Sequence, residues 1–284
     1  RAKQNMQQTA TPSTAFAAPP VPCIRHVLHP TSRRRNLAAL LVASFTSLHP
    51  AHVRGAQNSV ARDSAPQTNC IPSSDVKDRL RAAKVFCFDV DSTVITSEGI
   101  DELAATCGVK EEVEKLTAQA MGGGLPFHES LRARLDIMRP TKQQVENVHV
   151  ERPFAFSPHV KELVTLLHAR GAEVYLISGG FKEMILPLAT ELAIEADQVY
   201  ANELRFNADG SFRSFNPQAW TAAAGGKKRA IEHIRTLHSG DGDATVVMVG
   251  DGATDLEARD CYDGQGGADV MVGYGWNVVR GKVE

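Results

Sequence analysis

The sequence predicts an α/β fold in which a doubly wound parallel sheet carries an inserted helical cap domain. Short apolar runs recur along the chain, and most are followed by a segment with helical periodicity. That alternation is typical of parallel sheets with helices on both faces. The helical stretch after the first apolar run is too long for a simple crossover. We therefore interpret it as a cap over the carboxyl edge of the sheet.

Size and charge restrict the function classes. The 284 residues allow one large domain or two modest ones, and the net charge of −2 provides no basic field for nucleic acid. The five cysteines form no Cys-x-x-Cys pair, which argues against a disulfide framework and a zinc site. No apolar run has the length of about 20 residues that a membrane span needs. Both a monomer and a homodimer stay open.

Residues 1–72 have the composition of a targeting leader. They are rich in Ser, Thr, Ala, Pro and Arg, and no acidic residue precedes Asp63. This composition is typical of a transit peptide. We favour import into a plastid (chloroplast), with a mitochondrion as the alternative and secretion third. Because the chain begins with Arg rather than Met, we expect its natural start to lie upstream.

The first half of the remaining chain contains one expected strand and a long helical region. Ser73 is a plausible N-cap for a helix that runs through Arg81. Residues 85–89 follow as a buried strand. From Glu98 to about Val148 the pattern is helical, with breaks at Gly122–Gly124 and at Pro140.

The second half alternates strongly between the two kinds of element. Apolar runs predict strands at 174–177, 245–249 and 269–272, and periodicity predicts helices at 160–169, 181–193, 227–237 and 253–260. An extended segment at 198–206 leads into a turn at 207–210. We expect a catalytic core from 73–97 and 150–284, and a cap from 98–149.

Two carboxylates, Asp89 and Asp91, follow the first buried strand. Ligands of open α/β sheets bind at this edge. Side chains at i and i+2 can converge once the backbone leaves the extended form, and they would repel each other without a cation. Taken alone, the segment is equally compatible with a turn or a helix N-cap.

A second acidic segment follows the strand at 245–249. Asp251 lies between Gly250 and Gly252, which permit a tight turn and close approach of a ligand, and Asp255 comes four residues later. By itself this could be a structural loop. Together with Asp89 and Asp91 it predicts a magnesium site with few protein oxygens.

Two further segments have features of phosphate binding. Ser178, Gly179 and Gly180 join a strand to a helix, where N–H groups and the helix dipole favour an anion. Lys227 opens a later helix and can place its ammonium over a phosphate. In isolation, a simple turn and a solvated surface lysine would be the more common interpretations.

These four segments, in type and order, resemble the four motifs of the haloacid-dehalogenase (HAD) superfamily. Among its families, the sequence is most similar in pattern to the phosphoserine phosphatases. The similarity covers roughly 76–283 and extends through 98–101, 120–123, 126–127 and 250–257. Members of the superfamily continue through a last strand and helix, so we expect the chain to be a fragment at both ends.

The resemblance implies roles for the acidic residues. Asp89 would be the nucleophile and a Mg²⁺ ligand. Asp91 would be the general acid and base and would give its backbone carbonyl to the metal. Asp251 would be the remaining side-chain ligand, and Asp255 would support the metal site.

The resemblance also implies a substrate site. Ser178 and Lys227 would hold the phosphoryl oxygens, Glu98 would receive the substrate ammonium, and Arg134 would pair with its carboxylate. Other residues near the substrate would be Met121, Gly122, Phe127, Gly179, Gly180 and Thr254.

The activity implied is Mg²⁺-dependent hydrolysis of O-phospho-L-serine to L-serine and phosphate through an aspartyl-phosphate, the last step of phosphorylated serine biosynthesis. Two alternatives stay open. One is a phosphatase or phosphotransferase of the same superfamily that acts on another small phosphate ester. The other is a non-catalytic binding protein with the same fold, against which the intact Asp89, Asp91, Lys227 and Asp251 argue.

Overall fold

The computed structural model describes residues 74–121, 126–241, 244–259, 266–275, 277 and 278. The leader predicted at 1–72 and the substrate residue Gly122 lie outside these residues. Met121 ends a described helix, but its side chain is not described.

Within the described residues, five parallel strands form the central sheet, in the order β3-β2-β1-β6-β7. Their bounds are Val85–Phe88 (β1), Glu173–Phe181 (β2), Val199–Asn202 (β3), Val246–Gly250 (β6) and Val270–Gly273 (β7). Strand β1 lies in the middle, with Phe88 in register with Leu176 of β2 and Val249 of β6. The carboxyl ends of β1, β2 and β6 are therefore adjacent.

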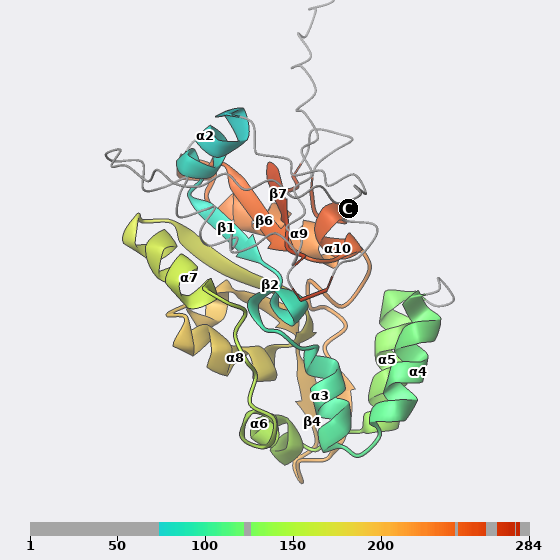
Figure 1. The fold of residues 1–284 in the computed structure, drawn as a ribbon. Helices are drawn as coiled ribbons and strands as arrows, with labels where there is room; N and C mark the ends of the chain where they lie inside the picture. Colours follow the sequence, from blue (N-terminus) through green and yellow to red (C-terminus); the bar gives the residue numbers. More distant parts are fainter. Residues whose placement is uncertain (1–73, 122–125, 242–243, 260–265, 276, 279–284) are drawn as a thin grey trace, which may run out of the picture.

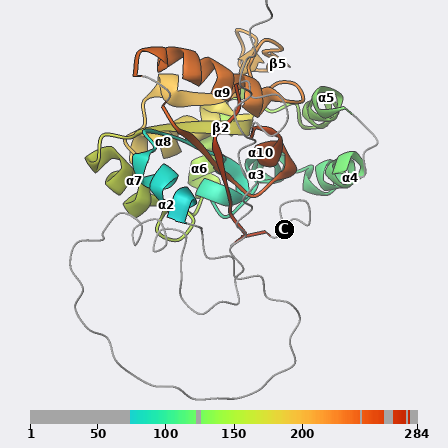
Figure 2. The same cartoon turned by 90° about the horizontal axis from the view of Figure 1, so that it is seen from above.

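Helices cover both faces of this sheet (Figures 1 and 2). Helices α2 (Ser74–Ala82), α7 (Val160–Ala169) and α8 (Lys182–Glu191) pack on one face, and α9 (Gly226–Leu237) and α10 (Ala253–Glu257) on the other. The alternation of strand side chains determines these layers: Phe86 and Phe88 enter one core cluster, whereas Val85 and Cys87 enter the other. The predicted doubly wound parallel sheet is confirmed.

A second group of helices follows β1: α3 (Gly99–Thr106), α4 (Lys110–Met121), α5 (Phe127–Met138) and α6 (Lys142–Glu151). They lie beyond the carboxyl end of the sheet (Figure 1). Their buried side chains, Leu131 and Leu135 among them, form a separate cluster. These helices occupy the place predicted for the cap, and the proposed domain limits stay a prediction.

The antiparallel hairpin of β4 (Leu204–Phe206) and β5 (Phe212–Phe215) joins that cluster through Leu204 and Phe212. The sequence predicts the extended segment and its turn but not β5. Two antiparallel connections link the sheet to α3–α6. In them, the N–H of Thr96 donates to the Ala155 carbonyl and the N–H of Ser157 donates to the Val94 carbonyl, each at 2.9 Å.

Two predicted elements differ from the observed ones by three residues or more. Strand β2 continues through Ser178 to Phe181, because the Ser178 hydroxyl accepts the N–H of Gly180 at 2.8 Å and a bulge accommodates the glycines. The helix expected at 253–260 ends at Glu257. The sequence also did not predict the kinked turn at Val90–Val94, in which Asp91 (ψ 133°) and Ser92 (φ 55°) have non-helical backbone angles.

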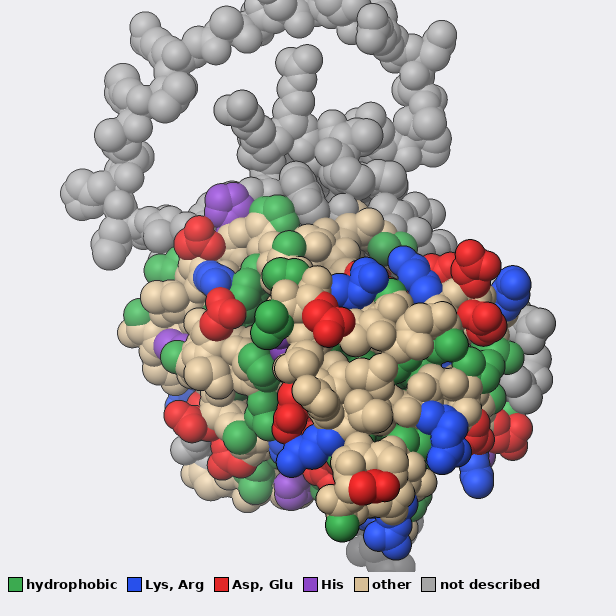
Figure 3. Space-filling view, turned by 90° about the horizontal axis from the view of Figure 1, so that it is seen from below, with side chains coloured by type: hydrophobic (Ala, Val, Ile, Leu, Met, Phe, Trp, Pro, Cys, Tyr) green, Lys and Arg blue, Asp and Glu red, His purple; other side chains and the backbone are tan. Residues whose placement is uncertain are grey.

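The surface viewed from the side of α3–α6 carries acidic and basic side chains interspersed (Figure 3). Among the described helices, none has the length and apolar character needed to cross a bilayer.

Candidate active site

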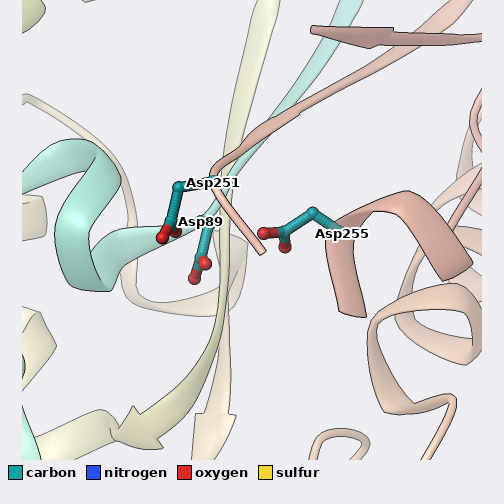
Figure 4. A group of neighbouring side chains, drawn as sticks. All are labelled: Asp89, Asp251 and Asp255. Atoms are coloured by element: carbon teal, nitrogen blue, oxygen red, sulfur yellow. The ribbon is translucent and has the colours of Figure 1, made fainter. Parts of the chain in front are cut away.

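Three carboxylates meet at the carboxyl edge of the sheet. Asp89 follows β1, Asp251 follows β6, and Asp255 lies in the first turn of α10. Each offers an oxygen that lies within 4.8 Å of the others, and all three residues are buried. In Figure 4, Asp89 and Asp251 lie side by side and Asp255 points toward them from the opposite side. Among the described residues, this is a group with the donor set of a metal site.

Lys227 lies against this group. Its Nζ is 2.8 Å from Asp89 Oδ2 and 2.5 Å from Asp255 Oδ1. The N–H of Gly252 donates to the other Asp255 oxygen at 2.8 Å. A Cβ on Gly250 would lie 2.3 Å from the Asp255 carboxyl carbon, so a side chain there would displace Asp255. The glycine before Asp251 thus permits the close approach of Asp255, whereas the sequence analysis expected the approach of a ligand.

The charges of the group do not balance. Burial raises the pKa of Asp89 well above its ordinary value; Asp255 raises it further, and Lys227 opposes the shift. Burial alone would lower the pKa of Lys227, but Asp255 and Asp89 raise it above its ordinary value. One ammonium therefore faces an excess of negative charge. A cation among Asp89, Asp251 and Asp255 would offset that excess, so the residues present fit a metal ion.

Asp91 lies in the same loop but faces another way. Its Oδ1 accepts the N–H of Gly99 at 2.7 Å, and its Oδ2 accepts the Ser178 hydroxyl at 3.1 Å. Burial, and then the charge of Glu98, raise the pKa of Asp91 to about 6. Asp91 can therefore hold or release a proton near neutral pH, close to the cluster of Asp89, Asp251 and Asp255.

The predicted phosphate-binding segment at 178–180 lies beside Asp91. Ser178 is fully buried and bonds to both Asp91 and the N–H of Gly180. A Cβ on Gly180 would lie 3.1 Å from Asp91 Oδ2. Asn202 Nδ2 donates to the Gly179 carbonyl at 2.8 Å and holds this segment from β3.

The predicted substrate residues on α3 and α5 are brought to the same edge. Glu98 Oε1 accepts the Ser92 hydroxyl at 2.7 Å. The Phe127 ring lies over Gly179, since a Cβ there would be 3.3 Å from its Cζ. The Nε of Arg134 donates to the Ser130 carbonyl of its own helix at 3.1 Å.

Burial lowers the pKa of Arg134, while Asp101 and Glu98 act in the opposite direction. The guanidinium is therefore partly desolvated and close to two carboxylates. Thr254, in contrast, is exposed on α10.

Three residues near the site were not predicted. Thr93 donates to Asp251 Oδ1 at 3.3 Å and Ser92 donates to Glu98. Asp101 has a buried Oδ1 without a hydrogen-bond partner among the described residues. Ser92 and Thr93 lie within the first acidic segment, which could have drawn attention to them. Asp101 lies within residues 98–101, which are part of the family resemblance and could have drawn attention to it.

A match to a protein-family model shows which class of hydrolase the chain belongs to. The model of the haloacid dehalogenase-like hydrolases matches residues 86–259, which include Asp89, Ser178, Lys227 and Asp251. The chain belongs to this family. The prediction that the chain is a hydrolase of the HAD superfamily is confirmed.

Curated relatives narrow the assignment. The chain is 46% identical over 206 residues to the chloroplastic phosphoserine phosphatase of Arabidopsis thaliana, covering 72% of this chain and 68% of that protein. It is 47% identical over 204 residues to the phosphoserine phosphatase of Drosophila melanogaster, covering 72% and 73%. These similarities place this HAD hydrolase among the phosphoserine phosphatases.

Solved structures agree on the fold. DsGPDH of Dunaliella salina is similar with a TM-score of 0.65 and 35% identity, over 75% of this chain. This chain spans 35% of that protein's length. A phospho-aspartyl intermediate analogue of phosphoserine phosphatase is similar with a TM-score of 0.53 and 31% identity, over 62% of this chain and 81% of that chain.

Proposed function

We propose that this HAD hydrolase is a Mg²⁺-dependent phosphatase that hydrolyses O-phospho-L-serine to L-serine and phosphate, with Asp89 as the nucleophile. The observation that carries the proposal is the position of Asp89. It lies at the carboxyl edge of the sheet, 2.8 Å from the Lys227 ammonium, within a buried group of carboxylates. The relatives named phosphoserine phosphatase support the substrate.

The metal is proposed from the chemistry of the donors. Asp89 and Asp251 would hold Mg²⁺ through carboxylate oxygens, together with the backbone carbonyl of Asp91, and Asp255 would support the site. Hard oxygen ligands of this type suit Mg²⁺. When bound, Mg²⁺ would neutralise charge on the phosphoryl group as it is transferred.

In the first displacement, an Asp89 oxygen bonds to phosphorus while the bond from phosphorus to the serine oxygen breaks. Asp91 gives its proton to that departing oxygen. Its raised pKa of about 6 keeps a protonated fraction available near neutral pH. Lys227 and Ser178 hold the phosphoryl oxygens and offset their charge.

In the second displacement, Asp91 takes a proton from a water molecule as the water oxygen bonds to phosphorus. The bond between phosphorus and Asp89 breaks, which restores the free carboxylate and releases phosphate. The hydrogen bonds of Asp91 to Gly99 and Ser178 keep its oxygens in place for both steps.

The rest of the substrate is a zwitterion. Glu98 would receive its ammonium, and Arg134 would grip its carboxylate with two hydrogen bonds. The Phe127 ring lies close to Gly179, where an added Cβ would be 3.3 Å from its Cζ, and would restrict the space for larger esters.

The test is phosphate release from O-phospho-L-serine by the full chain, with and without Mg²⁺, next to Asp89→Asn. We expect release that depends on Mg²⁺ and falls by roughly 10³-fold or more in the variant. If the folded protein releases phosphate only from other esters, the substrate is wrong. If it passes phosphate to an alcohol, it is a phosphotransferase. If Asp89→Asn retains activity, the nucleophile is wrong.

We further propose that the protein acts in a plastid as the last step of serine biosynthesis. The chloroplastic relative and the composition of residues 1–72 support this location. Import of the full chain, fused to a fluorescent protein, into isolated plastids and mitochondria would test it. Uptake by mitochondria alone would overturn the plastid assignment.

A further inference from the structure

Ser92 connects the nucleophile loop to the residue proposed to bind the substrate ammonium. Its hydroxyl donates to Glu98 Oε1 at 2.7 Å, and only 1% of the residue is exposed. Buried hydroxyl groups of this kind are either structural or functional, so the surrounding geometry has to decide between the two.

The backbone of Ser92 adopts an unusual conformation for serine. Its φ of 55° lies in the left-handed region, which glycine enters without a steric cost and other residues do not. The conformation is held by two hydrogen bonds: the N–H of Ser92 donates to the Ser97 carbonyl at 3.1 Å, and its carbonyl accepts from Asn277 Nδ2 at 2.9 Å. A glycine would satisfy the same backbone more easily, but it would leave Glu98 without this donor.

The bond to Glu98 is one of a set that closes the loop from 91 to 99. Asp91 accepts the N–H of Gly99, Ser92 binds Glu98 through its hydroxyl, and Ser92 binds Ser97 through its backbone. The Glu98 carboxylate is therefore fixed relative to Asp91, and through the loop relative to Asp89. The bond from Ser92 restricts rotation about the side-chain bonds of Glu98.

An ammonium group imposes little geometry of its own, because it is a compact charge with three equivalent donors. A carboxylate that receives it gains selectivity only if its oxygens are already held where the ammonium arrives. The Ser92 hydroxyl takes one lone-pair position on Oε1 of Glu98. This bond orients the Glu98 carboxylate before an ammonium arrives.

We propose that Ser92 is a positioning residue that holds Glu98 and thereby sets the preference of the enzyme for phosphate esters that carry an ammonium group. This rests on the proposed function, since Glu98 must bind the substrate ammonium for Ser92 to act through it. Ser92 touches no reacting atom, so its loss affects recognition of the ammonium and leaves the chemical steps intact.

The test uses Ser92→Gly and Ser92→Ala in the full chain with Mg²⁺. Both variants remove the hydroxyl, and glycine also accepts the left-handed backbone, so it remains informative if the alanine variant fails to fold. Three substrates separate the charges: O-phospho-L-serine, phosphoethanolamine, which lacks the carboxylate, and the des-amino analogue of phosphoserine, which lacks the ammonium. Ser157→Ala is the control, because Ser157 is also buried and also bonds to Asn277.

We expect KM for both ammonium-bearing esters to rise roughly tenfold in the two Ser92 variants, with kcat little changed. KM for the des-amino ester should stay within about twofold of the wild-type value, and Ser157→Ala should alter none of the three selectively. An equal rise in KM for all three esters, or a fall in kcat alone, would show a structural role for Ser92 and overturn the inference.

Wild-type behaviour separates this inference from the proposed function. If the wild type prefers phosphoserine over its des-amino analogue but the Ser92 variants keep that preference, only the inference fails. If the wild type does not distinguish the two esters, the proposed role of Glu98 fails, and the role of Ser92 fails with it.

Discussion

At the residue scale, the dominant feature is a buried lysine that forms ion pairs with two carboxylates. The Lys227 side chain is 9% exposed and contacts both Asp89 and Asp255, which are themselves buried. Removing one partner of a buried charged group costs far more than the pair contributes, because the remaining charges stay without compensation. Lys227 is thus a stability determinant of the metal-free protein in addition to its proposed catalytic role.

Replacing Lys227 with methionine, which fills similar space without charge, should therefore destabilise the metal-free protein. We expect a loss of about 3–5 kcal/mol in the free energy of unfolding, measured by chemical denaturation with a chelator present. Lys228→Met changes the neighbouring lysine as the control and should cost far less. Equal losses in both variants would contradict the assigned role of Lys227.

The raised pKa of Asp91 gives a pH dependence with a definite sign. Its pKa is about 6 in the folded protein, above the ordinary value of 3.8, so the folded state holds the proton more tightly than the unfolded state. The stabilising contribution of the protonated form is fully present below the unfolded pKa and is lost as pH rises through about 6.

We therefore expect metal-free wild-type protein to lose stability relative to Asp91→Asn as the pH rises from about 4 to 7. The readout is the difference in unfolding free energy between the two proteins across that range. A constant difference would show that the Asp91 pKa is not raised in the folded state.

The sequence predicted the residues whose chemistry defines the site but not those that hold them. Asp89, Asp91, Ser178, Lys227 and Asp251 lie in recognisable segments, and the structure brings them to one edge of the sheet. Ser92 and Asp101 lie in segments that the sequence singles out, but the sequence predicts no role for either. Their significance depends on a left-handed backbone angle and on a buried oxygen that has no hydrogen-bond partner among the described residues, which sequence patterns do not encode.

At the scale of elements, the start of α9 determines the position of Lys227. A Cβ on Gly226, the first residue of this helix, would lie 2.6 Å from the Trp220 carbonyl oxygen and 2.7 Å from the Thr221 Cα. Backbone atoms cannot yield at such distances without a shift of the helix. The glycine therefore sets how deeply α9 enters the site.

Gly226→Ala should move the start of α9 and carry the ammonium of Lys227 away from Asp89. We expect a loss of about 1–3 kcal/mol in stability and a fall in kcat for phosphoserine. The control is Gly240→Ala, where an added Cβ meets nothing within 4 Å. If both variants keep wild-type turnover and stability, Gly226 does not determine the position of α9.

Most elements of the described chain could be predicted, and the exceptions share a cause. The helix at 160–169 has the predicted bounds, and the strands predicted at 85–89, 174–177, 245–249 and 269–272 are all present. The strand predicted at 174–177 was too short because the sequence Ser178-Gly179-Gly180 is typical of a turn. In the structure, a bulge keeps these residues in β2. Strand β5 was missed because its pairing with β4 is what makes it a strand.

At the scale of the whole molecule, a metal ion would connect segments that lie far apart in the sequence. Asp89 and Asp251 directly follow β1 and β6. A ligand that binds only the folded arrangement of the two stabilises that arrangement by mass action. Stability should therefore depend on the Mg²⁺ concentration.

Above its dissociation constant, each tenfold increase in free Mg²⁺ should raise the unfolding free energy by about 1.4 kcal/mol. Thermal unfolding at several Mg²⁺ concentrations measures this slope, and Ca²⁺ in place of Mg²⁺ tests selectivity. Asp251→Asn should flatten the slope. The same slope in wild type and variant would mean that Mg²⁺ binds elsewhere.

The central position of β1 also has a consequence for synthesis on the ribosome. Its two neighbours, β2 and β6, are translated much later, with all of α3–α6 made in between. The apolar strand Val85–Phe88 therefore emerges long before β6 can pair with it. Nascent chains with such exposed strands are prone to aggregation. We expect the sheet to close only after β6 has left the exit tunnel, so that interruption of translation before Val246 leaves a product that depends on chaperones for solubility.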